Sequence, residues 1–409
     1  MRTLVIGAGI TGLSIAEHLR REGLKVILID RVSPGDPGQA SFGNAGILAR
    51  SAIVPVSQPG LIRKIPQMLI NPSSPLFVRW AYLPKLAPWL IPFLRSGSGE
   101  RLDEIISALD SLTSDAVDQH LKLTAGTDAR KFIRLGEIGY IYPDEEAFLD
   151  DSFMRETKSR YGYECRKLTR SQIEDLDPFI SKKYNVAAVY NNHGWITSPS
   201  KYVRAIFDSY ISLGGEYIQD EVIEILEKEV VLKNAKNLSV DKVILAMGAW
   251  SGSLAKKLGV RAKVESERGY HIFFKGSNRC PPFPIMLSDG KFFVTPMEGG
   301  IRCAGVVEFG SLTAPPSRKP IELIRSRVRE FYNDLDFEEE SVWMGHRPST
   351  PDSLPLIGTL KDKPNVIFAF GSQHIGLTIG PKIGYLVSQL MMNKKINCSI
   401  APFDSNRFN

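Results

Sequence analysis

The sequence predicts an α/β fold in which a Rossmann-type domain is interrupted by a second domain. The chain has 409 residues, more than one ordinary hydrophobic core needs, which indicates two domains. A strand–turn–helix–strand pattern with three glycines in its turn opens the chain. Two further strand–glycine segments come much later, at 241–252 and 364–391. A sheet that contains all three segments must be discontinuous in sequence.

Composition and charge exclude several classes of function. Hydrophobic residues make up 43% and charged residues 23% of the chain, which is typical of a globular protein. The net charge of +6 comes from scattered basic residues, so it weakly supports an anionic ligand and argues against nucleic acid. The cysteines Cys165, Cys280, Cys303 and Cys398 are far apart. We therefore expect no metal site and a reducing compartment.

The ends and the apolar runs of the chain predict a cytoplasmic protein. The sequence enters a strand directly after Met-Arg, without a charged leader, an apolar stretch and a cleavage site. The apolar run 86–94 is too short to span a bilayer, and two prolines interrupt it. Nothing in the sequence determines an oligomeric state.

The first turn has the pattern of a dinucleotide-binding unit. Residues 3–6 read as a buried parallel strand, and GAGITG follows at 7–12. Gly7 permits the tight turn, Gly9 lets the backbone approach a pyrophosphate, and Gly12 lets the helix pack on the strand. The N-terminal end of that helix presents N–H groups and a partial positive charge to the phosphates.

The second strand supplies an acid at its end. It covers 25–29, and the carboxylate of Asp30 can accept hydrogen bonds from ribose hydroxyls. An acid here also argues against a 2′-phosphate, and so against NADP. The cofactor-binding residues expected in this unit are Gly7, Gly9, Ile10, Thr11, Gly12, Asp30 and Arg31.

The stretch that follows Asp30 favours FAD over NAD. It reads RVSPGDPGQASFGNAG, and its two prolines and four glycines exclude a helix. Small residues let the backbone pass close to a large planar ligand, and Gln39, Ser41 and Asn44 offer hydrogen-bonding groups. An NAD enzyme would usually continue with another strand and helix. A plain surface loop is the alternative.

Two later segments strengthen this interpretation. DKVILAMGAWSG at 241–252 reads as a strand and a small-residue turn. PNVIFAFGSQHIGLTIGPKIGYLVSQLM at 364–391 reads as a strand, a glycine-rich loop and a helix with Pro381 near its first position. The start of such a helix can stabilise negative charge on a reduced flavin.

Six segments together resemble a known family. They are VIGAGITGLSIAEHL, ASFGNAG, SQPG (57–60), ILAMGAWSG, RPSTPDSLPLIG (347–358) and QHIGLTIGP (373–381). The ordered set is similar to the FAD-dependent amine and amino-acid oxidoreductases of the D-amino-acid oxidase-like (DAO) type, above all to the D-amino-acid dehydrogenases. The ERGYH and QHxGLT forms are similar to relatives that use D-hydroxyproline.

The resemblance implies a fold and a division into domains. An FAD-binding Rossmann-type domain would comprise 1–60, 150–255 and 345–409. A substrate domain of α+β type, built on a mixed and largely antiparallel sheet, would comprise 61–149 and 256–344. Some relatives attach the flavin through a cysteine, but none of the four cysteines here lies in a matching context. We therefore expect noncovalent FAD.

The resemblance also implies an activity. The enzyme would oxidise the Cα–N bond of a small D-amino or D-imino acid, such as D-proline or D-hydroxyproline, by hydride transfer to flavin N5. Electrons would pass to a quinone or another acceptor. The alternatives are an oxygen-using oxidase of the glycine, sarcosine or D-amino-acid type and a noncatalytic flavoprotein subunit.

The resemblance extends the set of cofactor-binding residues. Asn44, Ala45 and Gly46 would lie near the flavin ring, Val222 at the adenine end and Gly248 near the pyrophosphate. The further residues expected at the cofactor are Ala40, Ser41, Ala246, Trp250, Gly371, Gly376, Leu377 and Thr378.

Four residues are candidates for the substrate site. Arg347 lies in a proline-stiffened stretch and could hold a carboxylate with two parallel hydrogen bonds, unless it pairs with Asp352. In similar oxidases the arginine of this motif binds the substrate carboxylate, and a tyrosine matching Tyr270 supports it. His271 would lie on the opposite face of that strand. His374 could touch substrate or flavin; the related pattern GHQHxGLT reads GSQHIGLT here, so the first histidine's role is in doubt.

Residues 60–98 allow two interpretations. Arginine and lysine alternate there with tryptophan, tyrosine and leucine, and prolines break the helical pieces. The segment could make a peripheral contact with the inner face of the membrane and reach quinone. It could equally be a helical part of the substrate domain that buries its apolar face. Residues 101–125 are predicted to form one amphipathic helix.

Overall fold

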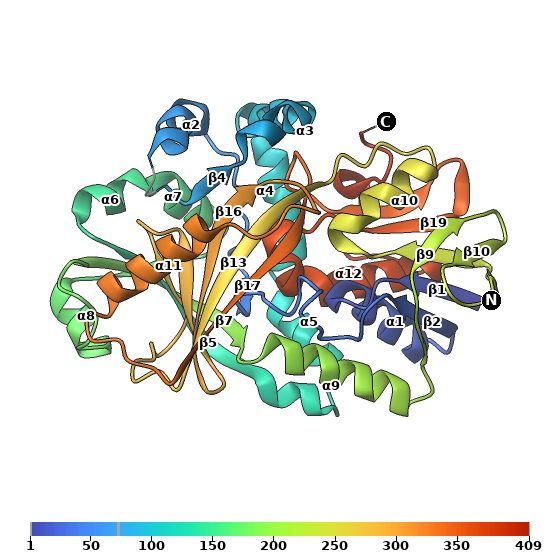
Figure 1. Ribbon diagram of the computed structural model, residues 1–409, viewed down its shortest axis with the longest axis horizontal. Helices are drawn as coiled ribbons and strands as arrows, with labels where there is room; N and C mark the ends of the chain where they lie inside the picture. Colours follow the sequence, from blue (N-terminus) through green and yellow to red (C-terminus); the bar gives the residue numbers. More distant parts are fainter. Residues whose placement is uncertain (1, 72–73, 409) are drawn as a thin grey trace.

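The computed structural model describes residues 2–71 and 74–408. Residues 1, 72–73 and 409, which the predicted domain ranges include, lie outside the described residues. The described part folds into two large sheets with helices packed on them, which confirms the predicted α/β class. In Figure 1 the sheet that contains β1 lies to the right and the sheet that contains β13 to the left.

The first sheet has the Rossmann-type pattern. Its central strands are mutually parallel, and β18 is antiparallel to β19 at one edge. Leu4 and Ile6 enter one core while Val5 enters the other, so the first strand is apolar on both sides. In the described residues the strand order is β18 (Leu356–Leu360), β19 (Lys363–Phe370), β12 (Lys242–Leu245), β1 (Arg2–Ile6), β2 (Lys25–Asp30) and β8 (Glu216–Gln219).

The second sheet is mixed and largely antiparallel, as expected. Among its described neighbours, only β14 with β5 and β16 with β4 run parallel. Its order is β17 (Glu339–Ser349), β13 (Glu265–Lys275), β16 (Gly300–Phe309), β15 (Phe292–Met297), β14 (Ile285–Leu287), β5 (Ile133–Tyr142), β7 (Val186–Ile196) and β3 (Ile47–Leu48), with β4 (Leu76–Val78) beside β16 and β6 (Cys165–Leu168) beside β7.

Helices cover both sheets. One face of the first sheet packs against α1, α9 and α12, and the other against α10 and a small sheet of β9 (Val222–Ile225), β10 (Glu229–Leu232) and β11 (Leu238–Ser239). α11 packs on the second sheet. The helices are α1 (Ile10–Arg21), α2 (Leu61–Ile70), α3 (Leu83–Arg95), α4 (Gly99–Thr113), α5 (Ala116–Leu123), α6 (Glu145–Asp150), α7 (Ser152–Arg160), α8 (Arg170–Leu176), α9 (Pro199–Ser212), α10 (Ser251–Lys257), α11 (Arg318–Phe331) and α12 (Gly376–Met391).

Five short 3₁₀ turns complete the described elements, and two of them border the site. They are η1 (Trp80–Tyr82), η2 (Asp128–Phe132), η3 (Gly248–Trp250), η4 (Gln373–Ile375) and η5 (Ala401–Phe403). η3 follows β12 and η4 follows β19, so both lie at the carboxyl ends of parallel strands, where α/β sheets bind ligands.

Two helix predictions need correction. The predicted helix 101–125 is two helices, α4 and α5, which separate at Ser114 and Asp115. The last helix begins at Gly376, five residues before Pro381, so the proline lies in its interior. A proline is tolerated there because another side chain takes the place of its missing N–H, as described below.

Sheet membership bears on the division into domains. β6 and β7 belong to the second sheet, although the predicted FAD-binding domain includes 150–255. The boundaries remain a prediction, and the strand pairing favours placing 150–196 in the substrate domain, where β5 is already predicted.

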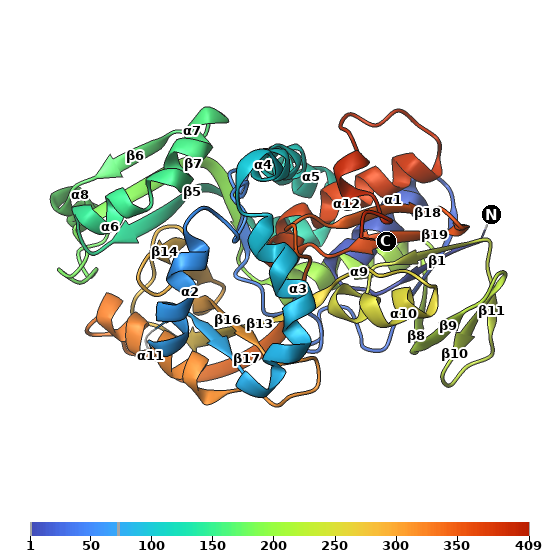
Figure 2. The same cartoon turned by 90° about the horizontal axis from the view of Figure 1, so that it is seen from above.

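The segment 60–98 forms α2, β4, η1 and α3; they lie along the upper side of the molecule in Figure 1, so α2 and α3 face the viewer in Figure 2. Leu86, Trp89 and Phe93 of α3 are buried, whereas Ile62, Trp80 and further side chains of the segment are exposed. In the described part of the chain, no helix has the length and apolarity to cross a bilayer. The buried side chains agree with a packed part of the substrate domain, and the exposed apolar side chains agree with a peripheral membrane contact.

Candidate active site

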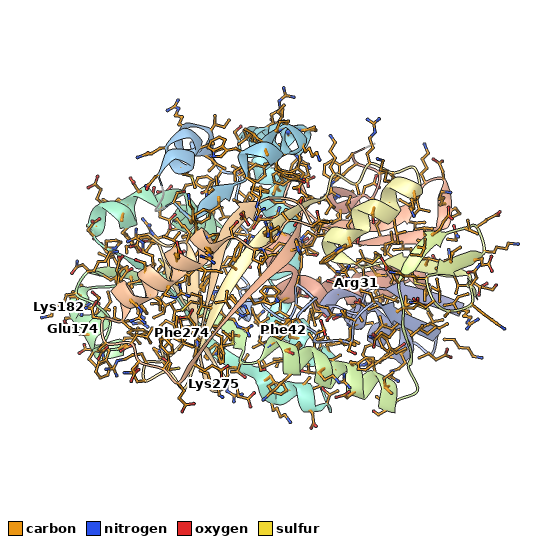
Figure 3. The ribbon with its side chains drawn as sticks, in the orientation of Figure 1. Arg31, Phe42, Glu174, Lys182, Phe274 and Lys275 are labelled. Atoms are coloured by element: carbon orange, nitrogen blue, oxygen red, sulfur yellow. The ribbon has the colours of Figure 1, made fainter. Side chains whose placement is uncertain are left out.

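One cavity of about 680 Å³ takes its wall from both sheets. The β1–α1 turn, the loop 38–45 and the carboxyl ends of β12 and β19 form one side, while β13, β15, β16 and β17 form the other. Arg31 and Phe42 lie in the middle of the molecule between the two halves, far from Glu174 and Lys182 at one end (Figure 3). The volume is within the range of pockets that bury a sizeable ligand.

The glycine turn has the geometry that the sequence predicts. Gly7 has φ +106°, and a Cβ there would lie 2.4 Å from the Ala246 carbonyl oxygen. A Cβ on Gly12 would lie 1.8 Å from the oxygen of Gly7, so this glycine lets helix α1 meet the turn. At Gly9, in contrast, the nearest atom to such a Cβ is the Ser41 Oγ at 3.4 Å. The backbone of Gly9 therefore borders the open cavity.

Asp30 is fixed at the end of β2. Its carboxylate accepts hydrogen bonds from the Ala8 N–H at 2.7 Å and from the Gln39 amide at 3.0 Å. Ser41 accepts from the Ile10 N–H at 3.0 Å. The loop after Asp30 is thus tied to the glycine turn, which makes one continuous polar edge along the cavity.

The loop 42–46 is held from behind by a buried arginine. Arg302 of β16 donates from Nη1 to the carbonyl oxygens of Phe42 at 3.0 Å and Asn44 at 2.8 Å. The Asn44 side chain accepts from the Gly46 N–H at 2.9 Å. Burial lowers the pKa of Arg302 to about 10, so the guanidinium stays protonated at neutral pH. The sequence contains no local signal for this contact, because the two segments are far apart in the chain.

His271 supports the same loop and does not line the cavity. Its Nδ1 is 3.0 Å from the Gly43 carbonyl oxygen, and its ring stacks on Trp343 with centroids 5.2 Å apart. Burial lowers the pKa of His271 to about 3, and the charge of Arg302 contributes in the same direction. The structure therefore corrects the expectation that His271 contacts the substrate, because its ring supports the loop 42–46 instead.

Arg347 projects from β17 across β13. Its Nη1 donates to Glu267 at 2.8 Å and to the Val306 carbonyl at 3.1 Å, and its Nη2 donates to the Gly305 carbonyl at 3.1 Å. The guanidinium lies against Gly269, where a Cβ would be 2.5 Å from its Cζ. Arg347 thus reaches the cavity only because residue 269 has no side chain.

The alternative partner of Arg347 is already occupied. Asp352 accepts from Arg101 at 2.9 Å and from Arg407 at 2.8 Å. Among the described residues the carboxylate next to Arg347 is Glu267, which also accepts from the Ser349 hydroxyl at 3.0 Å. The hydrogen bonds of Arg347 described above come from its two terminal nitrogens, so the side of the guanidinium formed by Nε and Nη2 keeps donors for a ligand.

Tyr270 lines the cavity with its ring, but its hydroxyl is engaged elsewhere. The hydroxyl donates to Glu308 at 2.5 Å and accepts from the Ser317 N–H at 3.0 Å. Burial and the bond to Glu308 raise the pKa of Tyr270 to about 12. Glu308 also pairs with the fully buried Arg268 at 2.9 Å. This arrangement offers a substrate the tyrosine ring rather than its hydroxyl.

His374 lies in η4, on the wall of the cavity. It is accessible where it lines the cavity, and its carbonyl oxygen is 3.4 Å from the Asn44 amide. The surrounding protein desolvates the ring and lowers the pKa of His374; Glu267 raises it and Arg347 lowers it by smaller amounts. The ring is therefore neutral at neutral pH and sits close to the Arg347–Glu267 pair.

The first turn of α12 also lines the cavity, and His120 of α5 supports it. Pro381 has no N–H for the carbonyl of Leu377, four residues earlier in the helix. The Nε2 of His120 lies 2.9 Å from that oxygen, and its Nδ1 lies 2.6 Å from the hydroxyl of Tyr202. Since Nε2 faces a carbonyl, it carries the proton, and Nδ1 accepts from Tyr202. Burial lowers the pKa of His120 to about 4.

The cavity brings most of the predicted residues together. Gly12, Gly46 and His271 are the predicted residues that do not line it. Those that do are Gly7, Gly9, Ile10, Thr11, Asp30, Arg31, Ala40, Ser41, Asn44, Ala45, Val222, Ala246, Gly248, Trp250, Tyr270, Arg347, Gly371, His374, Gly376, Leu377 and Thr378.

The residues of the cavity fit FAD. Gly9 has no side chain where its backbone borders the open cavity, which leaves the room that a pyrophosphate requires. The Asp30 carboxylate lies at the end of β2 beside the glycine turn, where it could accept from a ribose hydroxyl, and the first turn of α12 presents the positive end of a helix. Arg31 lies over the Trp250 ring at 4.2 Å, which closes the cavity beside the turn.

Comparison with known proteins agrees with this geometry. The family model described as "FAD dependent oxidoreductase" (DAO) matches residues 2–390. A D-amino-acid oxidase of Bradyrhizobium diazoefficiens is 32% identical over 413 residues, covering 99% of this chain and 98% of that protein. A D-amino acid dehydrogenase of Helicobacter pylori is 27% identical over 394 residues, covering 95% of this chain and 94% of that protein.

Solved structures share the fold. L-proline dehydrogenase from P. horikoshii superposes with a TM-score of 0.75 at 16% identity, covering 100% of this chain and 97% of that one. Glycine oxidase from Geobacillus kaustophilus gives a TM-score of 0.73 at 19% identity, covering 99% of both chains. At these identities the similarity establishes the architecture alone.

Proposed function

The chain belongs to the DAO family of FAD-dependent oxidoreductases, and from this premise we propose that it oxidises the Cα–N bond of a small D-amino or D-imino acid. The two named relatives that act on D-amino acids align over nearly the whole chain, which supports this substrate class. We propose D-proline and D-hydroxyproline as examples, supported by the ERGYH and QHxGLT forms of the sequence.

The placement of Arg347 carries the proposal. A carboxylate that leaves water needs a fixed cationic partner with free donors. The Nε–Nη2 side of Arg347 can give two parallel hydrogen bonds, and Glu267 and two carbonyls hold the rest of the guanidinium in place. A substrate carboxylate bound there would lie in the same cavity as the glycine turn and the loop 42–46.

The reaction needs alignment and a neutral amine more than it needs an acid or base catalyst. The substrate loses a hydride from Cα and a proton from nitrogen, and its C–N bond becomes a double bond. Bound FAD supplies the acceptor for that hydride. Arg347 orients Cα, Tyr270 and the strands around it exclude water, and neutral His374 can receive a hydrogen bond. The imine product then hydrolyses in solution.

We propose a quinone or another redox partner as the electron acceptor. The exposed side chains Ile62, Trp80 and Ile91 of the segment 60–98 would bring the enzyme to the inner face of the membrane. An oxygen-using oxidase is the second candidate, favoured by the name of the relative from Bradyrhizobium. A noncatalytic subunit would not need an arginine with free donors in the cavity.

Anaerobic flavin reduction tests the substrate class. The FAD-loaded protein is mixed without oxygen with single D- and L-amino acids, including both enantiomers of proline, and loss of the visible flavin band is followed. Fast bleaching by D-enantiomers and slow bleaching by L-enantiomers are expected. Bleaching by L-enantiomers alone would exclude the D-specific reaction, and no bleaching by any amino acid would favour a noncatalytic subunit. Readmission of oxygen or a quinone then identifies the acceptor.

A further inference from the structure

A second cation, Lys158, is buried in the wall of the same cavity. This residue of α7 is only 2% exposed. Among residues 2–71 and 74–408, no carboxylate oxygen forms an ion pair with the Lys158 ammonium, for which the limit is an N···O distance of 4.0 Å. Burying a charge without an opposite charge is costly, so the ammonium calls for a partner that the chain itself does not provide.

The contacts of Lys158 account for only part of its binding capacity. The ammonium donates to the Tyr140 hydroxyl at 3.0 Å and lies 4.3 Å from the Tyr140 ring and 4.4 Å from the Tyr190 ring. Aromatic faces stabilise a desolvated cation and also fix its position. An ammonium has three donors, so two remain after the bond to Tyr140.

The surroundings of Lys158 are suited to an anionic group on a short aliphatic chain. Met154 of α7, Met286 of β14 and Phe293 of β15 also line the cavity, and Met286 is the register partner of both Tyr140 and Phe293. Two further charged residues of the lining are near these elements in sequence: Asp151 directly precedes α7, and Lys291 directly precedes β15. Asp151 accepts from the Tyr142 hydroxyl at 2.8 Å, and Lys291 is exposed.

A neighbouring histidine, His193, is neutral and adds no charge beside Lys158. Burial lowers the pKa of His193 to about 3, and the charges of Lys158 and Arg50 contribute in the same direction. Arg50 itself pairs with Asp118 at 2.8 Å. Asp151 is thus the carboxylate named at this end of the cavity, and among the described residues it makes no ion pair with Lys158, so the ammonium keeps donors for an anionic ligand.

The two cations are separated along the sheet. The Arg347 guanidinium contacts β16, whereas Lys158 lies over Tyr140 of β5, three strands away in the order β16–β15–β14–β5. Three strand spacings amount to about 14 Å. A contact of about 3 Å at each end leaves roughly 8 Å for the separation of two anionic groups.

We propose that Lys158 binds a carboxylate at the end of the substrate side chain, so that the enzyme prefers D-amino acids with an acidic side chain longer than that of aspartate. This inference rests on the proposed function, since Arg347 must hold the α-carboxylate. It narrows the substrate class from small D-amino acids to those with a second carboxylate. Lys158 is then a residue that determines specificity and does not take part in the oxidation.

Binding of unreactive acids tests the site without catalysis. Glutarate and adipate are titrated into the FAD-loaded enzyme, with butyrate and hexanoate as the matched monocarboxylates, and the shift of the flavin spectrum is followed. The dicarboxylates should bind roughly 10-fold to 100-fold more tightly, as hydrogen bonds to a charged group predict. Lys158→Met should remove this difference. Lys201→Met, which removes an exposed lysine paired with Glu298, is the matched control and should keep it.

Substrate selectivity gives the second measurement. At low concentration, D-glutamate and D-2-aminoadipate should reduce the flavin at least about 10-fold faster than D-glutamine. The rate advantage of D-aspartate over D-glutamine should be smaller, because its side chain is shorter. Lys158→Met should abolish the preference, whereas Lys201→Met should keep both the preference and the rate with D-alanine. If Lys158→Met does not fold, the wild-type comparisons decide by themselves.

The outcomes separate the two proposals. Reduction by D-alanine together with no preference for acidic side chains and no tighter binding of dicarboxylates would overturn the role of Lys158 alone. If no amino acid reduces the flavin although dicarboxylates bind more tightly in a Lys158-dependent way, the anion site stands and the proposed function fails.

Discussion

The guanidinium of Arg347 and the carboxylate of Glu267 face each other across β17 and β13, 2.8 Å apart. The two residues are register partners in the strand pair, and Gly269, two residues further along, leaves room for the guanidinium. The cation expected to bind substrate is thus already held by a carboxylate. A substrate carboxylate must bind to its remaining donors and work against the charge of Glu267.

Replacement of Arg347 tests its role directly. If Arg347 holds the α-carboxylate, Arg347→Ala should cost about 2–5 kcal/mol of transition-state binding, as the loss of a hydrogen-bonded charge pair does. Anaerobic flavin reduction at low substrate should slow roughly 30-fold or more, and Arg347→Lys should recover only part of it. With an amino-acid amide, which lacks the carboxylate, the rate of flavin reduction should fall much less on mutation. FAD content should stay near that of the wild type.

A matched control separates charge loss from binding. Arg325→Ala also removes an arginine from an ion pair, that with Glu340, but outside the cavity, and it should reduce flavin at the normal rate. If Arg347→Ala keeps its rate or simply loses FAD, Arg347 is structural. Arg268 and Arg302 would then be poor substitutes, because neither lines the cavity.

Removal of the negative charge of Glu267 should strengthen anion binding, whereas removal of Arg347 should weaken it. In Glu267→Gln the amide oxygen can still accept from Arg347, while the competing negative charge is gone. A carboxylate ligand such as acetate or butyrate should therefore bind several-fold more tightly, since a like charge near the surface costs about 1 kcal/mol or more. Titration followed by the flavin spectrum measures this. Weaker binding would mean that Glu267 mainly orients Arg347.

The sequence predicts best what depends on neighbouring residues. The sequence predicts the glycine turn, Asp30 and the small-residue loop beside the ends of parallel strands, because their spacing alone indicates that place, and residues of all three line the cavity. Glu267 was missed although it lies three residues before Tyr270 in the same strand. Its partner is 80 residues away, and only the pairing of β13 with β17 brings the two together.

Residues that act from behind the site left no local pattern. Arg302 and His271 hold the loop 42–46 from the second sheet, and His120 supports α12 from α5. Each contact joins segments far apart in the chain. The interior position of Pro381 was missed for the same reason, since it depends on a donor from another helix.

Two glycines of the first turn should respond differently to substitution. A side chain at Gly9 would meet only the Ser41 Oγ near contact distance and would otherwise fill the open cavity. Gly9→Val should therefore fold as the apoprotein with nearly normal thermal stability but fail to bind FAD. Gly12→Val should unfold, because its Cβ would overlap the backbone of Gly7. Thermal melts and FAD titration by fluorescence measure both effects.

The attachment of FAD is tested on the same protein. Noncovalent binding predicts that acid precipitation of the wild type leaves the yellow colour in the supernatant. Colour that remains in the pellet would indicate a covalent link. Colourless Gly9→Val protein together with yellow wild type is the expected pair of results.

The exposed part of the segment 60–98 predicts a salt-sensitive interaction with anionic lipid. Arg63 and Lys85 are exposed, while Arg79 pairs with Glu308 and is not free to bind lipid. The side chain of Lys64 lies outside the described residues. Arg63→Glu combined with Lys85→Glu should release the enzyme from anionic liposomes at low salt. Equal recovery of wild type with and without liposomes would favour the interpretation as a packed part of the substrate domain.

The support of α12 by His120 makes the last prediction. Pro381 leaves the Leu377 carbonyl without its helical partner, and the imidazole of His120 donates to it at 2.9 Å. His120→Ala would leave a buried carbonyl unsatisfied, which costs about 1–3 kcal/mol of unfolding free energy. FAD should bind more weakly, because the first turn of α12 lines the cavity. Urea denaturation and FAD titration measure the two losses.

A double-mutant cycle identifies the cause. Pro381→Ala restores an N–H that can reach the Leu377 carbonyl within the helix, so the cost of His120→Ala should fall by about 1 kcal/mol or more in that background. Pro88→Ala, which restores an N–H in the unrelated helix α3, is the control and should leave the cost unchanged. Equal costs of His120→Ala with and without Pro381 would show that the histidine stabilises the helix through packing. Coupling specific to Pro381 would show that one side chain replaces the missing hydrogen bond of a proline at the cofactor end of α12.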